Sequence, residues 1–324
     1  MNKTVVGLLL LGTLFGARAW SDPVPGSLEV RWNEGADDCE KAEQPPPLQV
    51  HQYEPQTYIL RQSLCSNFEA PLMYLLIGSE EALLIDTGAV EDSPQMGLTR
   101  TIAELLRKKN AERIPLLVLH THGHGDHRAA DAQFAALPGV VVVPPEVGDL
   151  RTALNLPQWP EGVAHIALGG RTVDVIAAPG HQPAHLIFYD DRTALLFTGD
   201  FLLPGRLMVD DLDAYRASAA RLVSFLGDRP VSHVLGAHIE LDAKGELYPS
   251  GSQHHPSERA LALDRADVLA LPAALADFNG FYARHEHYVI TNPKRNLLTV
   301  VVGIVLFIVG IVGAWRRMRR RHQS

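Results

Sequence analysis

Short apolar runs alternate with segments of helical spacing along most of this chain. The runs are rich in Val, Leu and Ile and are bounded by polar or turn residues, as is typical of strands that are buried on both faces. Strands are expected at residues 57–62, 72–77, 82–85, 116–119, 140–143, 171–177, 185–189, 194–197 and 231–235.

Helical periodicity separates these runs. Residues 211–226 place Leu212, Tyr215, Leu222 and Phe225 on one face, as in an amphipathic helix. Further helices are expected at residues 96–109, 127–136 and 145–154. Strands in two groups, interleaved with helices, predict an α/β layered domain, which we assign to residues 57–250.

The segments that flank this domain lack the alternation. Residues 20–56 are rich in Pro, Gly, Asp and Glu and include three consecutive prolines from Pro45, so an irregular extension is expected there. Residues 251–296 form a polar C-terminal extension with one expected helix over residues 258–271.

Both ends of the chain carry signals for export and membrane insertion. Residues 1–19 resemble a secretory signal peptide, with Lys3 before an apolar core and Ala19 at a small-residue cleavage site. Residues 297–315 are uncharged and, as a helix, long enough to cross about 30 Å of hydrocarbon. Five arginines in residues 316–324 follow this span, so a cytoplasmic tail is expected. The layered domain would then lie on the periplasmic or extracellular side of the cell membrane, held by a single-pass anchor.

The charge of the part outside the membrane limits its partners. The chain has 29 basic and 37 acidic residues, and the signal and tail hold seven of the basic ones, which leaves 22 against 37 and a net charge of −15. A domain with this much negative charge is poorly suited to binding phosphate backbones. We therefore expect a small-molecule substrate and no nucleic acid. The sequence does not predict an oligomeric state.

The chain has two cysteines, Cys39 and Cys65. An even number in an exported chain suggests one disulfide, and two buried free thiols are the alternative. Neither cysteine lies near the histidine-rich motif described next, so neither is assigned as a metal ligand.

Residues 118–127 concentrate the chemistry of the chain. They read Val-Leu-His-Thr-His-Gly-His-Gly-Asp-His, and the first two residues end the strand expected at residues 116–119. His122, His124, Asp126 and His127 form a His-x-His-x-Asp-His pattern that can aim imidazoles and a carboxylate at one point, as a divalent cation such as zinc requires. Histidine tracts also occur as solvated, loosely binding surface segments, but here the intervening glycines allow the tight backbone turns that a metal site needs.

Three later loops repeat the arrangement of a strand, a small-residue turn and a polar side chain. His181, Asp200 and His238 each end such a loop. Strand ends at one edge of a sheet are where sites of α/β proteins are built, so these residues are candidates for the same site.

With these motifs, and with Leu-Ile-Asp-Thr-Gly at residues 84–88, the chain resembles the metallo-β-lactamase-fold superfamily over roughly residues 57–240. The resemblance implies an αβ/βα four-layer sandwich with metals at one edge. It also implies that Asp86 is a buried residue behind the metal ligands.

The resemblance further implies a ligand set for two divalent ions. His122, His124 and His181 would hold the first ion, Asp126, His127 and His238 the second, and Asp200 would bridge both. A metal-bridging hydroxide would be the nucleophile, and Asp126 would orient it and carry its proton to the leaving group. Zinc is the expected ion, and iron or manganese also suits these ligands.

The bridging Asp200 makes the set similar to glyoxalase II and related thioesterases, lactonases and phosphodiesterases. The expected function is therefore a membrane-anchored, extracytoplasmic, metal-dependent hydrolase of an ester, thioester, lactone or amide. The alternatives are a persulfide dioxygenase with one iron on His122, His181 and Asp200, a β-lactamase, and a non-catalytic binding protein with a degenerate site.

Five further histidines lie outside this set. His120 is expected to pack or to support a ligand, and His165 and His185 are expected to be structural because each lies in strand-like sequence. His254 and His255 belong either to a loop that faces the substrate or to a solvated turn.

Overall fold

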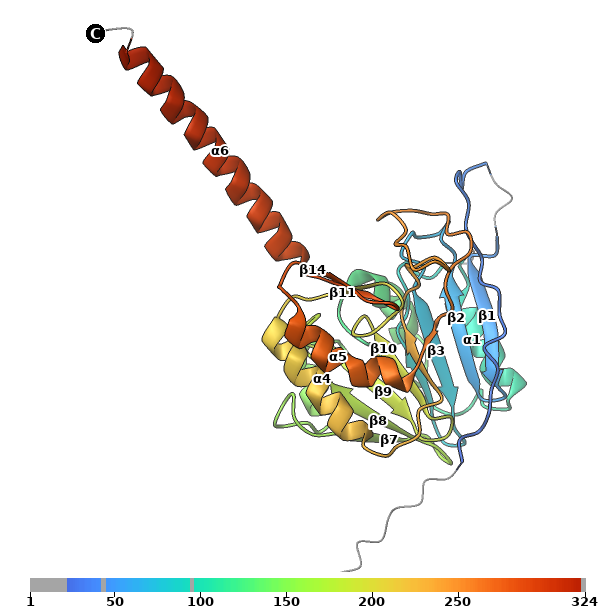
Figure 1. Cartoon of the computed structure of the whole chain (residues 1–324). Helices are drawn as coiled ribbons and strands as arrows, with labels where there is room; N and C mark the ends of the chain where they lie inside the picture. Colours follow the sequence, from blue (N-terminus) through green and yellow to red (C-terminus); the bar gives the residue numbers. More distant parts are fainter. Residues whose placement is uncertain (1–21, 42–44, 94–95, 322–324) are drawn as a thin grey trace, which may run out of the picture.

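In the computed structural model, which describes residues 22–41, 45–93 and 96–321, the chain forms two facing sheets with helices outside them (Figure 1). The predicted signal peptide at residues 1–19 lies outside the described residues. The first six-stranded sheet has the order β1 (Leu48–Glu54), β2 (Thr57–Gln62), β3 (Leu72–Ile77), β4 (Ala82–Ile85), β5 (Leu116–Leu119) and β6 (Val140–Val142). The second has the order β13 (Ala262–Leu263), β12 (His233–Gly236), β10 (Leu195–Gly199), β9 (Leu186–Asp190), β8 (Thr172–Ala177) and β7 (Ala164–Ala167).

Both sheets are mixed. In the first sheet β1 to β4 pair antiparallel, whereas β4, β5 and β6 pair parallel. In the second sheet β10 and β12 pair parallel and the other neighbours antiparallel. The parallel strands place the loops that follow β4, β5, β10 and β12 at the ends of their sheets where functional loops of α/β proteins gather.

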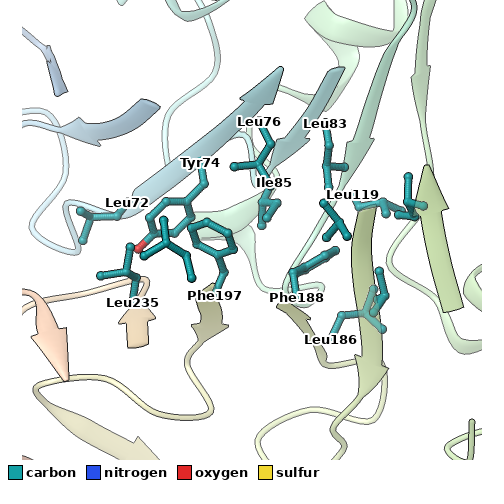
Figure 2. Packing of buried hydrophobic residues seen from close by; sticks show 14 of the residues in the cluster. Leu72, Tyr74, Leu76, Leu83, Ile85, Leu119, Leu186, Phe188, Phe197 and Leu235 are labelled. Carbon is teal, nitrogen blue, oxygen red and sulfur yellow. The ribbon is translucent and has the colours of Figure 1, made fainter. Parts of the chain in front are cut away.

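The central strands, such as β3, β4, β9 and β10, are buried on both faces, which explains why they read as continuous apolar runs. In β3, Leu72, Tyr74 and Leu76 point into the core between the sheets, while Met73 and Leu75 pack on the outer side. Figure 2 shows Tyr74 facing Phe197 of the second sheet, with their ring centroids 4.5 Å apart. The Tyr74 hydroxyl donates to the carbonyl of Gly236, so the two sheets are joined by a polar contact as well.

Helices cover the outer face of each sheet and complete the four layers. They are α1 (Leu98–Lys108), α2 (Asp131–Ala135), α4 (Leu212–Leu226) and α5 (Arg265–Asp277). Helix α3 (Val147–Ala153) instead contributes Leu150 to the core between the sheets. Ile102 of α1 and Phe134 of α2 pack on the first sheet, and Leu222 of α4 and Leu271 of α5 pack on the second. The expected αβ/βα sandwich is therefore what the described residues form.

Two expectations about the flanking segments were wrong. Residues 48–54, inside the segment expected to be irregular, form edge strand β1, and its half-exposed residues hid the strand pattern. The helix expected at residues 258–271 instead runs from Arg265 to Asp277, because Asp264 caps it through a reciprocal bond with Asp267. The preceding residues are held elsewhere, since Glu258 pairs with Arg61 at 2.6 Å.

The single disulfide expected from the cysteine count is present. Cys39 and Cys65 are bonded across 26 residues and clip the N-terminal extension to the loop between β2 and β3. The loop that the disulfide holds also carries Phe68 and Glu69, which line the cavity described below.

A small third sheet connects the sandwich to the C-terminal helix. It has the order β11 (Arg206–Met208), β15 (Val289–Thr291) and β14 (Tyr282–Arg284), none of which the sequence predicted. Helix α6 (Pro293–Arg321) begins directly after β15 and extends alone, away from the sandwich (Figure 1). Its stretch Pro293–Gly313 is long and apolar enough to cross a membrane and is not buried against the rest of the protein.

A buried ion pair joins the two sheets. Arg171, in the turn between β7 and β8, donates to both carboxylate oxygens of Asp190, at 2.9 and 2.5 Å. The same guanidinium donates to the Thr57 hydroxyl and to the Gln56 carbonyl of the first sheet. Breaking such a pair leaves a buried charge without a partner.

We therefore expect Arg171→Met to lower the free energy of unfolding by about 3–5 kcal/mol, as measured by urea unfolding of the full chain in detergent. The matched control is Arg31→Met, because Arg31 forms an exposed pair with Glu34 and its loss should leave stability unchanged within error. Equal stability of the two variants would show that the Arg171 pair does not hold the sheets together.

Candidate metal centre

The seven candidate residues, though spread over more than a hundred positions, meet at one edge of the sandwich. His122, His124, Asp126 and His127 lie on the loop after β5 of the first sheet. His181, Asp200 and His238 lie on the loops after β8, β10 and β12 of the second sheet. They form two groups that could each hold a metal ion, namely His122, His124 and His181, and Asp126, His127, Asp200 and His238.

Three ring nitrogens converge in the first group. Nε2 of His122 lies 2.9 Å from Nδ1 of His124, and Nε2 of His181 lies 3.2 and 3.1 Å from those two atoms. In a tetrahedral zinc site with Zn–N bonds of about 2.0–2.1 Å, two ligand nitrogens lie about 3.3–3.4 Å apart. Three nitrogen lone pairs that point at one another repel unless a proton or a cation lies between them. A cation at the centre of the triangle would accept all three, so this set of donors fits a metal ion.

The second group combines two imidazoles with two carboxylates. Oδ2 of Asp126 lies 3.1 Å from Nε2 of His127 and 3.2 Å from Nε2 of His238. Nε2 of His127 and Oδ1 of Asp200 are buried and have no hydrogen-bond partner among the described residues. Buried polar atoms without partners are costly, so these two orphaned atoms also fit a bound cation.

Asp200 lies between the two groups. Its Oδ2 is 3.9 Å from His122 Nε2 and 3.7 Å from His181 Nε2, while its Oδ1 is 3.6 Å from His127 Nε2 and 3.3 Å from His238 Nε2. One carboxylate thus presents a different oxygen to each group, which is the geometry that a bridging ligand needs.

A backbone requirement fixes the position of Asp200. The preceding Gly199 has φ +51°, and a Cβ atom there would lie 2.5 Å from Cβ of Thr121. A glycine is therefore required for β10 to end against the loop of the first sheet.

Each of three imidazoles is oriented by a hydrogen bond from its other nitrogen. Nδ1 of His127 bonds Oδ2 of Asp86 at 2.9 Å, Nδ1 of His181 bonds the Met208 carbonyl at 3.0 Å, and Nδ1 of His238 bonds the Glu69 carbonyl at 2.7 Å. These bonds turn Nε2 of each of these three rings towards the centre. Hydrogen bonds from the other ring nitrogen commonly orient metal-binding histidines in this way.

Asp86 lies behind the site, as the sequence analysis expected. It is fully buried, and besides His127 it accepts hydrogen bonds from the backbone nitrogen and the hydroxyl of Thr121. Its φ of +66° is a left-handed conformation that few residues other than glycine adopt. The carboxylate thereby fixes both the start of the histidine-rich loop and the tautomer of His127.

Electrostatics separate the two groups. Burial, reinforced by the neighbouring His127 and His181, lowers the pKa of His122 well below its usual value, so its ring stays neutral and able to act as a ligand. Burial alone would raise the pKa of Asp200, but the facing His238 and His127 outweigh it and hold that pKa below the usual range. Asp200 is therefore ionised at neutral pH.

The remaining histidines have other partners. His120 bonds Asp131 at 2.8 Å, away from the convergent nitrogens. His185 is fully buried and stacks on His122 with their centroids 5.2 Å apart, whereas His165 is largely exposed and pairs with Asp174. His254 bonds Asp37 at the surface.

His255 lines a cavity of about 700 Å³ that adjoins the site, and it is buried. It therefore does not lie in a solvated turn. Its ring stacks on Tyr248 and bonds Glu258 at 3.0 Å. No motif in the sequence predicted the other walls of this cavity, which include Phe68, Glu69, Arg206, Met208 and Glu240. They lie on loops and a short edge strand that have no periodicity to mark them.

Comparisons with known proteins agree with this geometry. The chain is 32% identical over 120 residues to a hydroxyacylglutathione hydrolase of Rhizobium meliloti, covering 35% of this chain and 45% of that protein. It is 32% identical over 206 residues to the lactamase-like protein vrtG of Penicillium aethiopicum, covering 61% of each. It is 30% identical over 155 residues to an atrochrysone carboxyl ACP thioesterase of Aspergillus chevalieri, covering 45% of this chain and 44% of that protein. The chain thus spans less than two thirds of the length of these relatives.

The fold is also similar to a solved structure. A metallo-β-lactamase from Pontibacter korlensis superposes with a TM-score of 0.50 at 18% identity, covering 71% of this chain and all of that one. The model of the metallo-β-lactamase superfamily matches residues 67–272, which include all seven candidate residues. On that match, this chain belongs to the metallo-β-lactamase superfamily.

Proposed function

We propose that this protein is a membrane-anchored, extracytoplasmic hydrolase that uses two divalent metal ions, with zinc as the expected ion, to cleave a small acyl substrate. Thioesters come first among the candidates, followed by esters, lactones and amides. The observation that carries the proposal is the position of Asp200 between two complete donor groups. The relatives named as hydrolases and as a thioesterase support the reaction class.

We assign the candidate ligands to the two ions as follows. His122, His124 and His181 would hold one ion, Asp126, His127 and His238 the other, and Asp200 both. Two bound cations supply a water molecule of near-neutral pKa and polarise a carbonyl oxygen. The bonds from Asp86, Met208 and Glu69 keep the imidazoles in the ligand orientation.

Asp126 would also move the proton. Its carboxylate lines the cavity beside the candidate ligands His127 and His238. An ionised Asp126 can accept a proton from water and pass it to the leaving group. The cavity of about 700 Å³ has room for a small acyl compound.

Metal analysis tests the proposal directly. The full chain in detergent should contain about two divalent ions per chain, and a chelator should abolish thioester hydrolysis until zinc is returned. One iron per chain, with oxygen consumption on a persulfide and no hydrolysis, would instead support the dioxygenase alternative.

A histidine variant tests the assignment of the ligands. His181→Ala should reduce the metal content from about two ions to about one per chain, because it removes one of three nitrogens from a single group. His165→Ala is the matched control and should keep both ions, since its exposed ring bonds Asp174 far from the site. Equal metal contents would contradict the role of His181.

The anchor can be tested by truncation. A chain that ends at Asn292 should leave the membrane fraction, whereas the full chain should stay in it, because α6 is the one described helix long and apolar enough to span a membrane. A tag placed after Ser324 should become accessible only once the membrane is permeabilised. A truncated chain that remained in the membrane fraction would contradict the proposed anchor.

A further inference from the structure

The cavity wall beside the candidate metal centre has no free positive charge. Among the lining residues that the structure describes, Arg206 is the single Lys or Arg. Nη1 of Arg206 lies 2.8 Å from Oε1 of Glu240, and its Nη2 donates to the Tyr248 carbonyl at 2.6 Å. Its backbone nitrogen donates to the other oxygen of Glu240 at 2.5 Å. The charge of Arg206 is thus neutralised within the wall, and two of its guanidinium nitrogens are engaged there.

The same wall does carry a free negative charge. Glu69 lines the cavity, and within the described part of the chain its carboxylate forms neither an ion pair nor a side-chain hydrogen bond. Its backbone is fixed beside the site, because its carbonyl accepts the bond from His238 Nδ1 at 2.7 Å. The Glu69 side chain is exposed, so its carboxylate is open to a ligand that enters the cavity.

Apolar side chains complete the cavity. Phe68 is 42% exposed and Met208 is 37% exposed, although both are large apolar residues. Leu203 and Ile239 lie behind them and are buried. Of the four acidic residues in this lining, Asp126 and Asp200 belong to the candidate metal centre and Glu240 pairs with Arg206. The wall therefore offers a bound substrate apolar contact and the carboxylate of Glu69.

We infer that the cavity selects acyl substrates with a cationic or uncharged group near the scissile bond, and that Glu69 is the residue that discriminates against a carboxylate there. The inference rests on the proposed hydrolase function and adds the substrate class. Away from the ions of the proposed centre, an anionic group would meet Glu69 with no unpaired Lys or Arg of the wall to offset it. A cationic group there would gain a partner that Glu69 lacks in the free protein.

Three thioesters of one short acyl chain test the inference, because their thiols differ in charge. The thiols are thiocholine (cationic), 3,3-dimethylbutanethiol, its uncharged isostere, and 3-mercaptopropionate (anionic). With the metal-loaded full chain in detergent, kcat/KM is measured from the release of thiol. The cationic ester should exceed the anionic one by about tenfold, with the uncharged ester between them, as expected for one partly screened charge pair.

Two substitutions at one position assign the effect to Glu69. Glu69→Gln keeps the size of the side chain and the backbone bond to His238, so the cation-to-anion ratio should fall to near one while the metal content is unchanged. Glu69→Lys should invert the ratio. The control is Glu80→Gln, which removes an exposed carboxylate in the turn between β3 and β4, at the other end of the strands, and should leave the ratio at its wild-type value.

The outcomes separate the two proposals. Hydrolysis that favours the anionic thioester, or a ratio that Glu69→Gln leaves unchanged, would overturn this inference and leave the proposed hydrolase standing. Failure to hydrolyse any acyl substrate with metal bound would overturn the proposed function and this inference with it.

Discussion

The candidate centre depends on the face-to-face packing of the two sheets, because neither sheet carries a complete set of donors. The loop after β5 supplies four of the seven residues, and the second sheet supplies His181, Asp200 and His238. The first group needs His181 to complete its triangle, and the second needs both Asp200 and His238. The core around Tyr74 and Phe197 therefore sets the distances between donors even though it lies outside the site.

This constraint explains which features the sequence could predict. Strands buried on both faces are apolar at most positions, and β2, β3, β4 and β5 were predicted at their observed bounds. The donors could be found because each follows such a strand after a small residue, as Gly199 precedes Asp200. The close approach of the two sheets requires a glycine at position 199. The small residue that marked this loop in the sequence is therefore explained by the packing of the sheets.

The features that escaped prediction lie where that constraint is absent. Edge strand β1 is partly exposed and carries polar residues, so its pattern resembles that of a loop. Strands β11, β14 and β15 have three residues each, too few to show a period. The walls of the cavity are set by pairings between distant positions, such as Arg206 with Glu240, and no local pattern encodes those pairings.

The third sheet gives the C-terminal helix a structural connection to the centre. Met208 of β11 is paired with Thr291 of β15, and α6 begins two residues later at Pro293. The carbonyl of Met208 accepts the bond that orients His181, and its side chain lines the cavity. The base of the helix and a candidate ligand are thus connected through the paired strands β15 and β11. Lys294 of α6 also pairs with Asp210, two residues after β11 ends. If α6 spans a membrane, the cavity must lie close to the surface of that membrane, because only one pair of neighbouring strands separates them.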